Sequence, residues 1–488
     1  MRRSTGIFSP SPLQLNILGP IWMTFEMVLD SVRTLLAHDP LIKTYTRPLE
    51  VIGCESVSTF SLLYLLPSVL LAGTLYPKFS HLRSLRWIRL LVLMPWSVYT
   101  SLRLPVDYCF TPTTRSGYPN LALACASFTV AARSFHWGLL STYKQGKIFK
   151  RTEFLLPSSP THSSPTDPST GKKFTHPNNP SSAFSDWLTW TLELVSSPRG
   201  IQYEWGVRAP PSRENALDII KRMYKMNLVH VVATGYSILC RDHGSPTGAL
   251  RSLVGFSHFY GERVVAEGLA SLAFGYFLVS QIDLMFGYFS LLIHLINLLH
   301  RHLLHLPEWM MRSCDTRTLV PMFNSPHAAP SLAHLWGKAW HQNFRQSFLI
   351  VGGSPAATLA RTLGLNPKLQ RLAGMLGCFV VSAILHEYAL HFIARQPHPS
   401  PHILFHEFPG SAVYFLAQPV GILVEPFLLP YLPRGGGVVW CYLFTLVTTI
   451  PFRKQYFMPA RLLDHSYPPL SRYWILSSLL IPGFTSRR

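Results

Sequence analysis

The feature that most constrains this chain is a series of apolar runs, each about long enough to cross a lipid bilayer as a helix. Hydrophobic residues make up 48% of the 488 residues and charged residues only 14%. This composition favours one membrane domain over several soluble ones. We therefore predict an all-α, polytopic membrane protein with about eight to ten transmembrane helices. The runs lie at residues 56–76, 87–102, 121–143, 223–240, 264–281, 284–300, 374–394, 412–431 and 438–452, with a short apolar tail at 474–484.

The segments between these runs suggest a domain organisation. Residues 1–50 suit an N-terminal interfacial helix, and the start of the chain lacks the apolar core of a secretory signal. Residues 51–143 hold the first transmembrane helices. Residues 144–183 are basic and rich in Ser, Pro and Thr, which is typical of a disordered loop. Residues 184–488 form the predicted core.

Charge and cysteine content narrow the range of partners. The net charge is +20, and the basic residues flank apolar runs, which fits anionic membrane lipids better than nucleic acid. We expect the basic loops to face the cytosol and predict no nucleic-acid partner. The seven cysteines are scattered and contain no CxxC pair. We interpret them as small buried apolar side chains.

Two stretches carry the residues that suit chemistry. Residues 334–348 (HLWGKAWHQNFRQSF) are crowded with Trp, His, Gln, Asn and Arg, and lie between apolar runs. Residues 382–390 (SAILHEYAL) contain His386 and Glu387 inside an apolar run. Ionisable side chains are costly within a membrane, so this pair is a functional hypothesis by default.

A metal site and a transporter are two alternative interpretations. Membrane di-iron enzymes use histidine clusters, but this chain has no adjacent His-His pair, and His386 and His391 are too far apart in angle to share a helix face. A transporter would often show broken helices in matching halves, whereas the polar cluster here lies in one half. The histidines of the metal interpretation are His300, His302, His305, His386, His391, His398, His402 and His406.

Acyl transfer to a hydroxyl is the third interpretation. It needs a base for the alcohol proton and a donor for the developing oxyanion. Burial disfavours the charged form of a histidine, so His386 would stay a neutral base. Glu387 would point about 100° away on a helix and need not pair with that imidazole. The other interpretation of His386 is a packed structural histidine, and the presence of the polar stretch at residues 334–348 makes this interpretation weaker.

The two stretches resemble the wax synthase-like branch of the membrane-bound O-acyltransferases. The similarity includes Ser382–Glu387, Trp336-Gly337, and Arg199-Gly200-Ile201 with Trp205, in the order expected for that family. It also includes Pro321-Met322-Phe323, Ser331-Leu332 and Trp340-His341-Gln342. Ala383 stands where many members have Gly.

The resemblance implies a set of roles around a chamber enclosed by the helices. His386 would be the catalytic base and His341 a second polar catalytic residue. The substrate or acyl-donor chamber would be shaped by Trp336, Trp340, Gln342, Asn343, Arg345 and Glu387. No metal and no bound cofactor is implied.

The resemblance also implies substrates and a location. The co-substrate would be an acyl-CoA from the cytosol, and the acceptor a lipophilic alcohol from the bilayer. The loop and length are most similar to fungal O-acetyltransferases, which favours acetyl-CoA and a terpenoid or meroterpenoid of secondary metabolism. A long-chain wax ester or sterol ester synthase is the alternative. The endoplasmic reticulum is the expected membrane.

Overall fold

The computed structural model describes residues 54–457 except 80–81, 111–116, 140–179, 198, 202, 204, 208, 256–257, 305, 307–310, 312 and 394–409. The predicted N-terminal segment 1–50, the loop 144–179 and the tail 474–484 lie outside the described residues, as do His398, His402 and His406.

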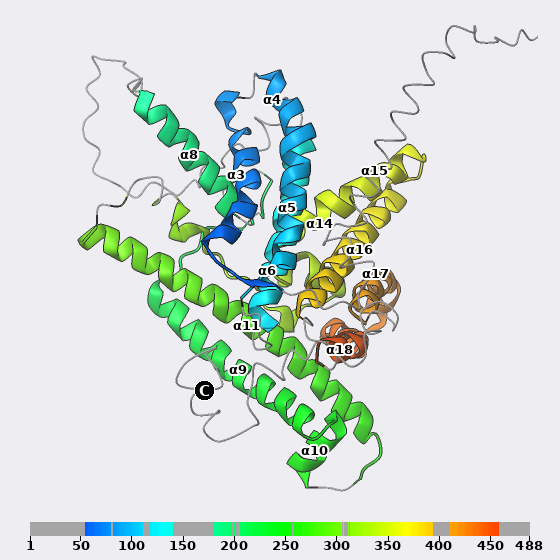
Figure 1. The fold of residues 1–488 in the computed structure, drawn as a ribbon. Helices are drawn as coiled ribbons and strands as arrows, with labels where there is room; N and C mark the ends of the chain where they lie inside the picture. The colour runs from blue at the N-terminus through cyan, green and yellow to red at the C-terminus, as the bar shows by residue number, and fades with distance from the viewer. Residues whose placement is uncertain are drawn as a thin grey trace, which may run out of the picture.

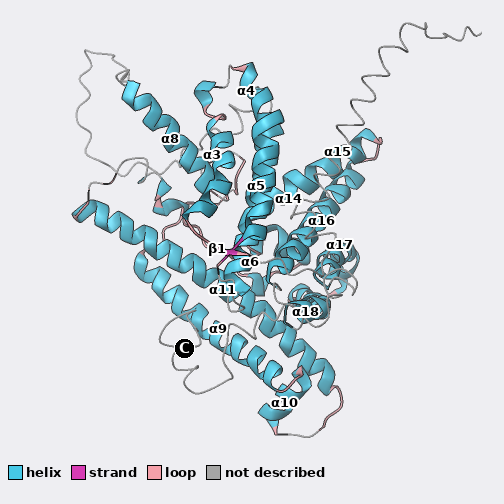
Figure 2. Ribbon diagram, in the orientation of Figure 1, coloured by secondary structure: helices cyan, strands magenta, loops and turns pink. Residues whose placement is uncertain are grey.

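The described residues are almost entirely helical (Figure 2). The α-helices are α3 (Leu66–Gly73), α4 (Arg83–Ile88), α5 (Met94–Asp107), α6 (Gly117–Leu139), α8 (Pro180–Ser196), α9 (Ala216–Asp242), α10 (Pro246–Val254), α11 (Glu262–His302), α13 (Leu332–His334), α14 (Arg345–Phe348), α15 (Ser354–Thr362), α16 (Pro367–Ile393), α17 (Gly410–Leu428) and α18 (Gly436–Phe457). Short 3-10 or π segments are η1 (Thr59–Leu65), η2 (Pro77–Phe79), η3 (Arg89–Leu93), η4 (Thr316–Thr318), η5 (Pro326–Ala328), η6 (Leu335–Ala339), η7 (Leu349–Gly353) and η9 (Leu429–Tyr431). Strands β1 (Glu55–Ser56) and β2 (Tyr108–Cys109) form one parallel pair.

The prediction of an all-α membrane protein is confirmed. Among the described residues, four helices are long and apolar enough to cross a bilayer: α11, α16, α17 and α18. In Figure 1, α9 and α11 run side by side diagonally below the other helices, α3, α5 and α8 stand above them, and α15 to α18 lie to the right. Helix α8 begins at Pro180, so the last four residues of the predicted disordered loop, 180–183, belong to a helix.

The prediction of two separate spans at 264–281 and 284–300 is wrong. Both belong to α11, a continuous helix of 41 residues that is about 60 Å long. Asp283 lies between the two predicted spans, and no Gly or Pro stands there to interrupt the helix. Arg222 of α9 lies 2.6 Å from the Asp283 carboxylate, so the charge is paired within the helix pair and the helix continues.

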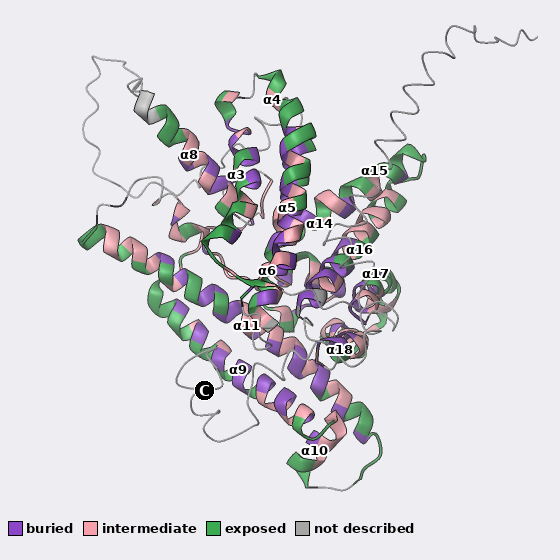
Figure 3. Cartoon of the chain, viewed as in Figure 1, coloured by how far each residue is buried: buried purple, intermediate pink, exposed green. Residues whose placement is uncertain are grey.

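The outer faces of the helices are apolar, as a membrane domain requires. Phe427 is 77% exposed, Val232 73% and Val447 65%. Figure 3 shows that exposed residues follow the outer faces of the helices and buried residues follow the faces that meet. Such side chains can be solvated by lipid, whereas in water this much contiguous apolar surface would drive association.

One cysteine pair departs from the sequence interpretation. Cys54 and Cys109 form a disulfide, although 55 residues separate them. The hairpin of α3 and α5 returns the chain to its starting level, where β1 pairs with β2 and brings the two sulfur atoms together. The interpretation as buried apolar side chains is therefore wrong for these two. Cys240, Cys314 and Cys441 are free and buried, as expected.

Close backbone contact positions α16 for its role in the site. A Cβ atom at Gly352 in η7 would lie 2.1 Å from the carbonyl oxygen of Gly377 in α16. Only glycine at this crossing lets the two backbones approach so closely. The same face of α16 packs against α15, and α17 packs between α16 and α18.

Candidate active site

His386 lies on α16 with its ring in an aromatic enclosure. Nδ1 of His386 is 2.8 Å from the carbonyl oxygen of Ser382, one turn earlier. A carbonyl only accepts, so Nδ1 carries the proton and Nε2 keeps its lone pair. The ring centroid lies 4.1 Å from that of Phe415 and 5.7 Å from that of Phe452. The structure thus holds one tautomer of this imidazole, with Nε2 as the basic atom.

The stretch at residues 334–348 begins in a short helix, α13, which is followed by a π turn. Ser331 begins α13 and accepts a hydrogen bond from the backbone N–H of His334, a standard N-cap. The wider π turn η6 then carries Trp336. The Trp336 ring lies 6.0 Å from that of Phe415 and 5.6 Å from that of Trp340. Phe415 therefore contacts both the Trp336 ring and the His386 ring.

His341 is buried among aromatic rings beside this turn. Its centroid lies 5.5 Å from that of Trp340 and 5.7 Å from that of Phe323. Burial, with His386 and Arg199 adding to it, lowers the pKa of His341 to about 3, so the ring is neutral at physiological pH. Its Nδ1 atom finds no hydrogen-bond partner among the described residues.

Two neighbouring amides complete this part of the wall. The Oδ1 atom of Asn343 is buried and has no partner in the described part of the chain. Gln342 instead donates from Nε2 to the carbonyl oxygen of Trp340 at 2.7 Å, which closes the loop on itself. Buried polar atoms without partners are costly. The free positions on His341 and Asn343 thus suit a polar ligand.

These residues surround one large cavity of about 1740 Å³. The structure brings together in its wall the predicted residues His386, His341, Trp336, Trp340, Gln342, Asn343 and Arg345. Its volume exceeds that of a typical small-molecule pocket, which suits two substrates better than one. Ala383 does not line the cavity; it is buried in the aromatic core beside Phe274 and Phe277.

Glu387 is the one predicted site residue that is not in the cavity wall. Its carboxylate accepts hydrogen bonds from the Ser411 hydroxyl, from the Ala412 backbone N–H at 3.2 Å, and from Gln455 Nε2 at 3.1 Å. It follows His386 by one residue and so leaves α16 in another direction. Glu387 therefore joins α16 to the start of α17 and to α18.

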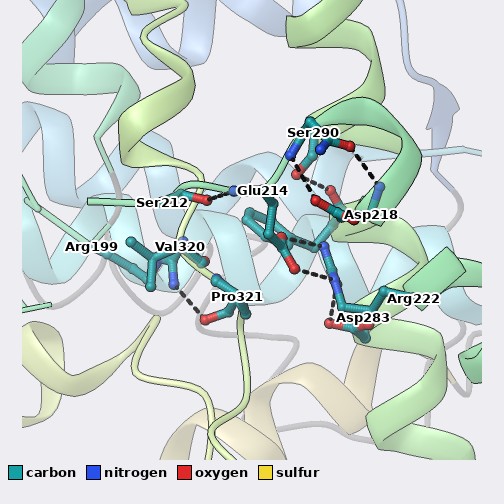
Figure 4. A network of polar contacts seen from close by, with 11 residues as sticks. Arg199, Ser212, Glu214, Asp218, Arg222, Asp283, Ser290, Val320 and Pro321 are labelled. Carbon is teal, nitrogen blue, oxygen red and sulfur yellow. Dashed lines mark hydrogen bonds and ion pairs between the residues drawn. The ribbon is translucent and has the colours of Figure 1, made fainter. Parts of the chain in front are cut away.

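Arg199 connects the earlier RGI motif to the site. Its guanidinium donates to the carbonyl oxygens of Val320 and Pro321, at 2.6 and 3.3 Å (Figure 4). Gly200 has a φ of +58° and lies against the Trp205 ring, where a Cβ atom would be 2.4 Å from the ring. The motif thus anchors the segment around Val320 and Pro321, which leads into the stretch at residues 334–348. Arg199 itself lines the cavity.

Comparison with known proteins finds one family model that matches part of the chain. Residues 319–407 match the membrane bound O-acyl transferase family, and this segment contains His341 and His386. The matched segment is 89 of the 488 residues. The match agrees with the all-helical fold and the apolar spans of the described residues.

Several known proteins are similar to parts of this chain. O-Mevalon transferase yanI of Aspergillus niger is 27% identical over 264 residues, 49% of this chain and 52% of that protein. Acetyltransferase AOL_s00215g273 of Arthrobotrys oligospora is 29% identical over 120 residues, 22% and 24% of the two chains. Acyl-CoA--sterol O-acyltransferase 1 of Arabidopsis thaliana is 31% identical over 85 residues, 17% and 24%. The matched region covers about half the length of yanI and about a quarter of the length of each of the other two proteins.

Some residues of the candidate site were missed in the sequence. Tyr414 and Phe415 of α17 line the cavity and contact Trp336, and Gln418 accepts a hydrogen bond from its indole. Aromatic residues in an apolar run look like ordinary lipid-facing residues. The polar Gln418 and the ionisable Glu425 inside a predicted span were a signal that could have been used.

Proposed function

We propose that this protein moves an acyl group from an acyl-CoA to the hydroxyl of a lipophilic alcohol, with His386 as general base. Nε2 of His386 takes the hydroxyl proton as the alcohol oxygen bonds to the thioester carbonyl carbon. The carbon–sulfur bond then breaks, and the CoA thiolate leaves with the proton that His386 returns. The products are an ester and free CoA, and no covalent enzyme intermediate is needed.

The observation that carries this proposal is the fixed tautomer of His386 in the cavity wall. The hydrogen bond from Nδ1 to Ser382 leaves Nε2 as the acceptor, and the Phe415 ring packs against the imidazole. His341 supports the step from the same cavity. Its buried Nδ1 lacks a partner among the described residues and, as N–H, would donate to the developing oxyanion.

We propose acetyl-CoA as the donor and a terpenoid or meroterpenoid alcohol of a fungal pathway as the acceptor. Similarity to an acetyltransferase and to an O-mevalon transferase, both fungal, supports this choice. A long-chain wax or sterol ester synthase is the second candidate. It is supported by the similarity to a plant sterol O-acyltransferase and by the large cavity volume.

We place the protein in the endoplasmic reticulum membrane, with the Cys54–Cys109 end of the α3–α5 hairpin on the lumenal side. Disulfides persist in oxidising compartments such as the lumen, and cytosolic thiols stay reduced. Lys78, Arg83 and Arg86 lie at the opposite end of that hairpin, between α3 and α5. Basic loops favour the cytosolic side, so the two observations support the same orientation.

The test is product mass in microsomes that express the chain. Acetyl-CoA or palmitoyl-CoA is supplied with hydroxylated terpenoids, sterols and fatty alcohols in turn. We expect one added acetyl group on a terpenoid alcohol, and a loss of about 10²–10⁴ in rate in His386→Ala. His334→Ala is the matched control, since His334 is in the stretch at residues 334–348 but does not line the cavity. Normal turnover by folded His386→Ala would refute the mechanism, and long-chain esters would favour the second candidate.

A further inference from the structure

Helix α17 carries three buried polar side chains spaced seven residues apart. Ser411 and Gln418 are 0% exposed and Glu425 is 4% exposed. Seven residues are nearly two helical turns, so the three lie along one face of α17. They lie in a helix that is otherwise apolar enough to span a membrane, where each buried polar group is costly unless it is hydrogen-bonded. We call these three residues the α17 polar row.

The two later members of the row, Gln418 and Glu425, form hydrogen bonds with the start of the stretch at residues 334–348 and with the residues just before it. The Glu425 carboxylate accepts hydrogen bonds from the backbone N–H groups of Leu332 and, at 3.2 Å, of Ala333. These are among the free N–H groups at the start of α13, where a negative charge is also favoured by the helix dipole. Nearly two turns earlier in α17, Oε1 of Gln418 accepts from Nε1 of Trp336 at 3.1 Å.

Gln418 is itself fixed on both sides. Its Nε2 donates to the carbonyl oxygen of Tyr414 at 3.1 Å and to the hydroxyl of Thr448 in α18 at 3.2 Å. With its nitrogen held, the amide oxygen is directed at the Trp336 indole. Trp336 can then contact Phe415, which lies against the ring of His386.

The first member of the row holds the segment that carries His386. Ser411 donates from its hydroxyl to the Glu387 carboxylate, and its backbone N–H donates to Oε1 of Gln455 at 2.7 Å. Glu387 directly follows His386 in α16. One face of α17 thus contacts both stretches that the sequence singled out, which lie on different elements.

We propose that the α17 polar row sets the position of residues 332–336, and with them the Trp336 ring, relative to His386. Gln418 is the main positioning residue of the row. This inference rests on the proposed function, because it assigns Gln418 an effect on turnover. Gln418 lies outside the cavity wall and acts through Trp336. Removing its amide would leave the Trp336 N–H without an acceptor and let the indole rotate within the cavity.

The experiment compares kcat and KM of Gln418→Met with those of wild type in microsomes, using the active substrate pair. We expect kcat/KM to fall by about 10- to 100-fold, the range expected when a reacting geometry is displaced by about an ångström. Gln418→Glu keeps an oxygen acceptor for the indole but loses the two Nε2 hydrogen bonds, so its kcat/KM should fall between those of Gln418→Met and wild type. Ser290→Ala is the control: it removes an equally buried hydrogen bond, to the Phe286 carbonyl in α11, away from both stretches.

A double-mutant cycle separates positioning from general stability. Trp336→Phe deletes the same hydrogen bond from the other side and leaves α17 unchanged. We expect Gln418→Met and Trp336→Phe together to cost no more than the larger single change, whereas Ser290→Ala and Trp336→Phe should be additive. Additive losses for the first pair, or kcat/KM of folded Gln418→Met within about threefold of wild type, would overturn the proposal.

A readout without turnover keeps this proposal distinct from the proposed function. Cys378 lines the cavity next to Phe379, whose ring lies 6.0 Å from that of Trp336. N-ethylmaleimide should alkylate Cys378 faster in Gln418→Met than in wild type or Ser290→Ala, with buried Cys314 as the internal reference. If wild type gives no product with any pair, the proposed function fails. Unchanged Cys378 alkylation would overturn the positioning role by itself.

Discussion

Replacing Glu387 with Ala tests whether this residue supports the fold or takes part in the chamber. The substitution removes the acceptor of the Ala412 N–H, of Gln455 Nε2 and of the Ser411 hydroxyl. A buried donor left without a partner costs about 1–3 kcal/mol, and the hydroxyl can rotate to another acceptor. Two stranded donors therefore lower the free energy of unfolding by about 4 kcal/mol.

The size of the chain sets how this loss appears in a melting experiment. At about 2.1 cal/mol/K per residue, 488 residues give an unfolding entropy of about 1 kcal/mol/K. We therefore expect the melting temperature of Glu387→Ala to fall by about 4 °C. The assay heats the detergent-solubilised protein and measures the fraction that remains monodisperse by size-exclusion chromatography.

Two controls define the outcome. Glu387→Gln keeps one acceptor oxygen and should melt between wild type and Glu387→Ala. Asp186→Ala removes an exposed carboxylate from α8 and should change the free energy by less than about 0.5 kcal/mol. A melting temperature for Glu387→Ala within about 1 °C of wild type, with turnover lost at a permissive temperature, would refute the structural assignment. It would return Glu387 to the chamber, as the resemblance implied.

Three further predictions follow from the site. Arg199→Met should lower the melting temperature by about 2–4 °C, because the carbonyls of Val320 and Pro321 lose their donor, whereas exposed Arg213→Met should not. Gly352→Ala should lower the melting temperature by several degrees, since its Cβ would meet the Gly377 carbonyl, and Gly268→Ala, where the space is open, should leave it unchanged or higher. The pKa of His341 is about 3 in the folded protein and about 6.5 in the unfolded chain. Because the unfolded chain binds the proton more readily, His341 leaves the free energy of unfolding unchanged above pH 6.5 and lowers it as the pH falls below 6.5. At pH 5 this amounts to about 2 kcal/mol, and melting curves of His341→Asn should lack that acid-dependent loss; equal curves would contradict it.

The helical membrane fold and most residues of the candidate site could be predicted from the sequence because both depend on local patterns. Apolar runs of bilayer length require helices, since no other open structure satisfies the backbone in lipid. His386 in such a run and the crowded stretch around Trp336 and His341 stood out because polar groups are costly there. The structure brings these side chains into one cavity wall, as the sequence suggested.

Other features depended on which helices pack together, and no local pattern reveals that. Asp283 lies between the two predicted spans, and its carboxylate is paired with Arg222 of the neighbouring helix while α11 continues through it. Glu387 has the same sequence position whether it faces the chamber or the start of α17, and only the packing of α17 against α16 selects the second. The sequence alone determined that the chain lies in a membrane and where its basic histidine is. The tertiary structure decided what surrounds that histidine, because a buried polar side chain takes its role from the partner that satisfies it.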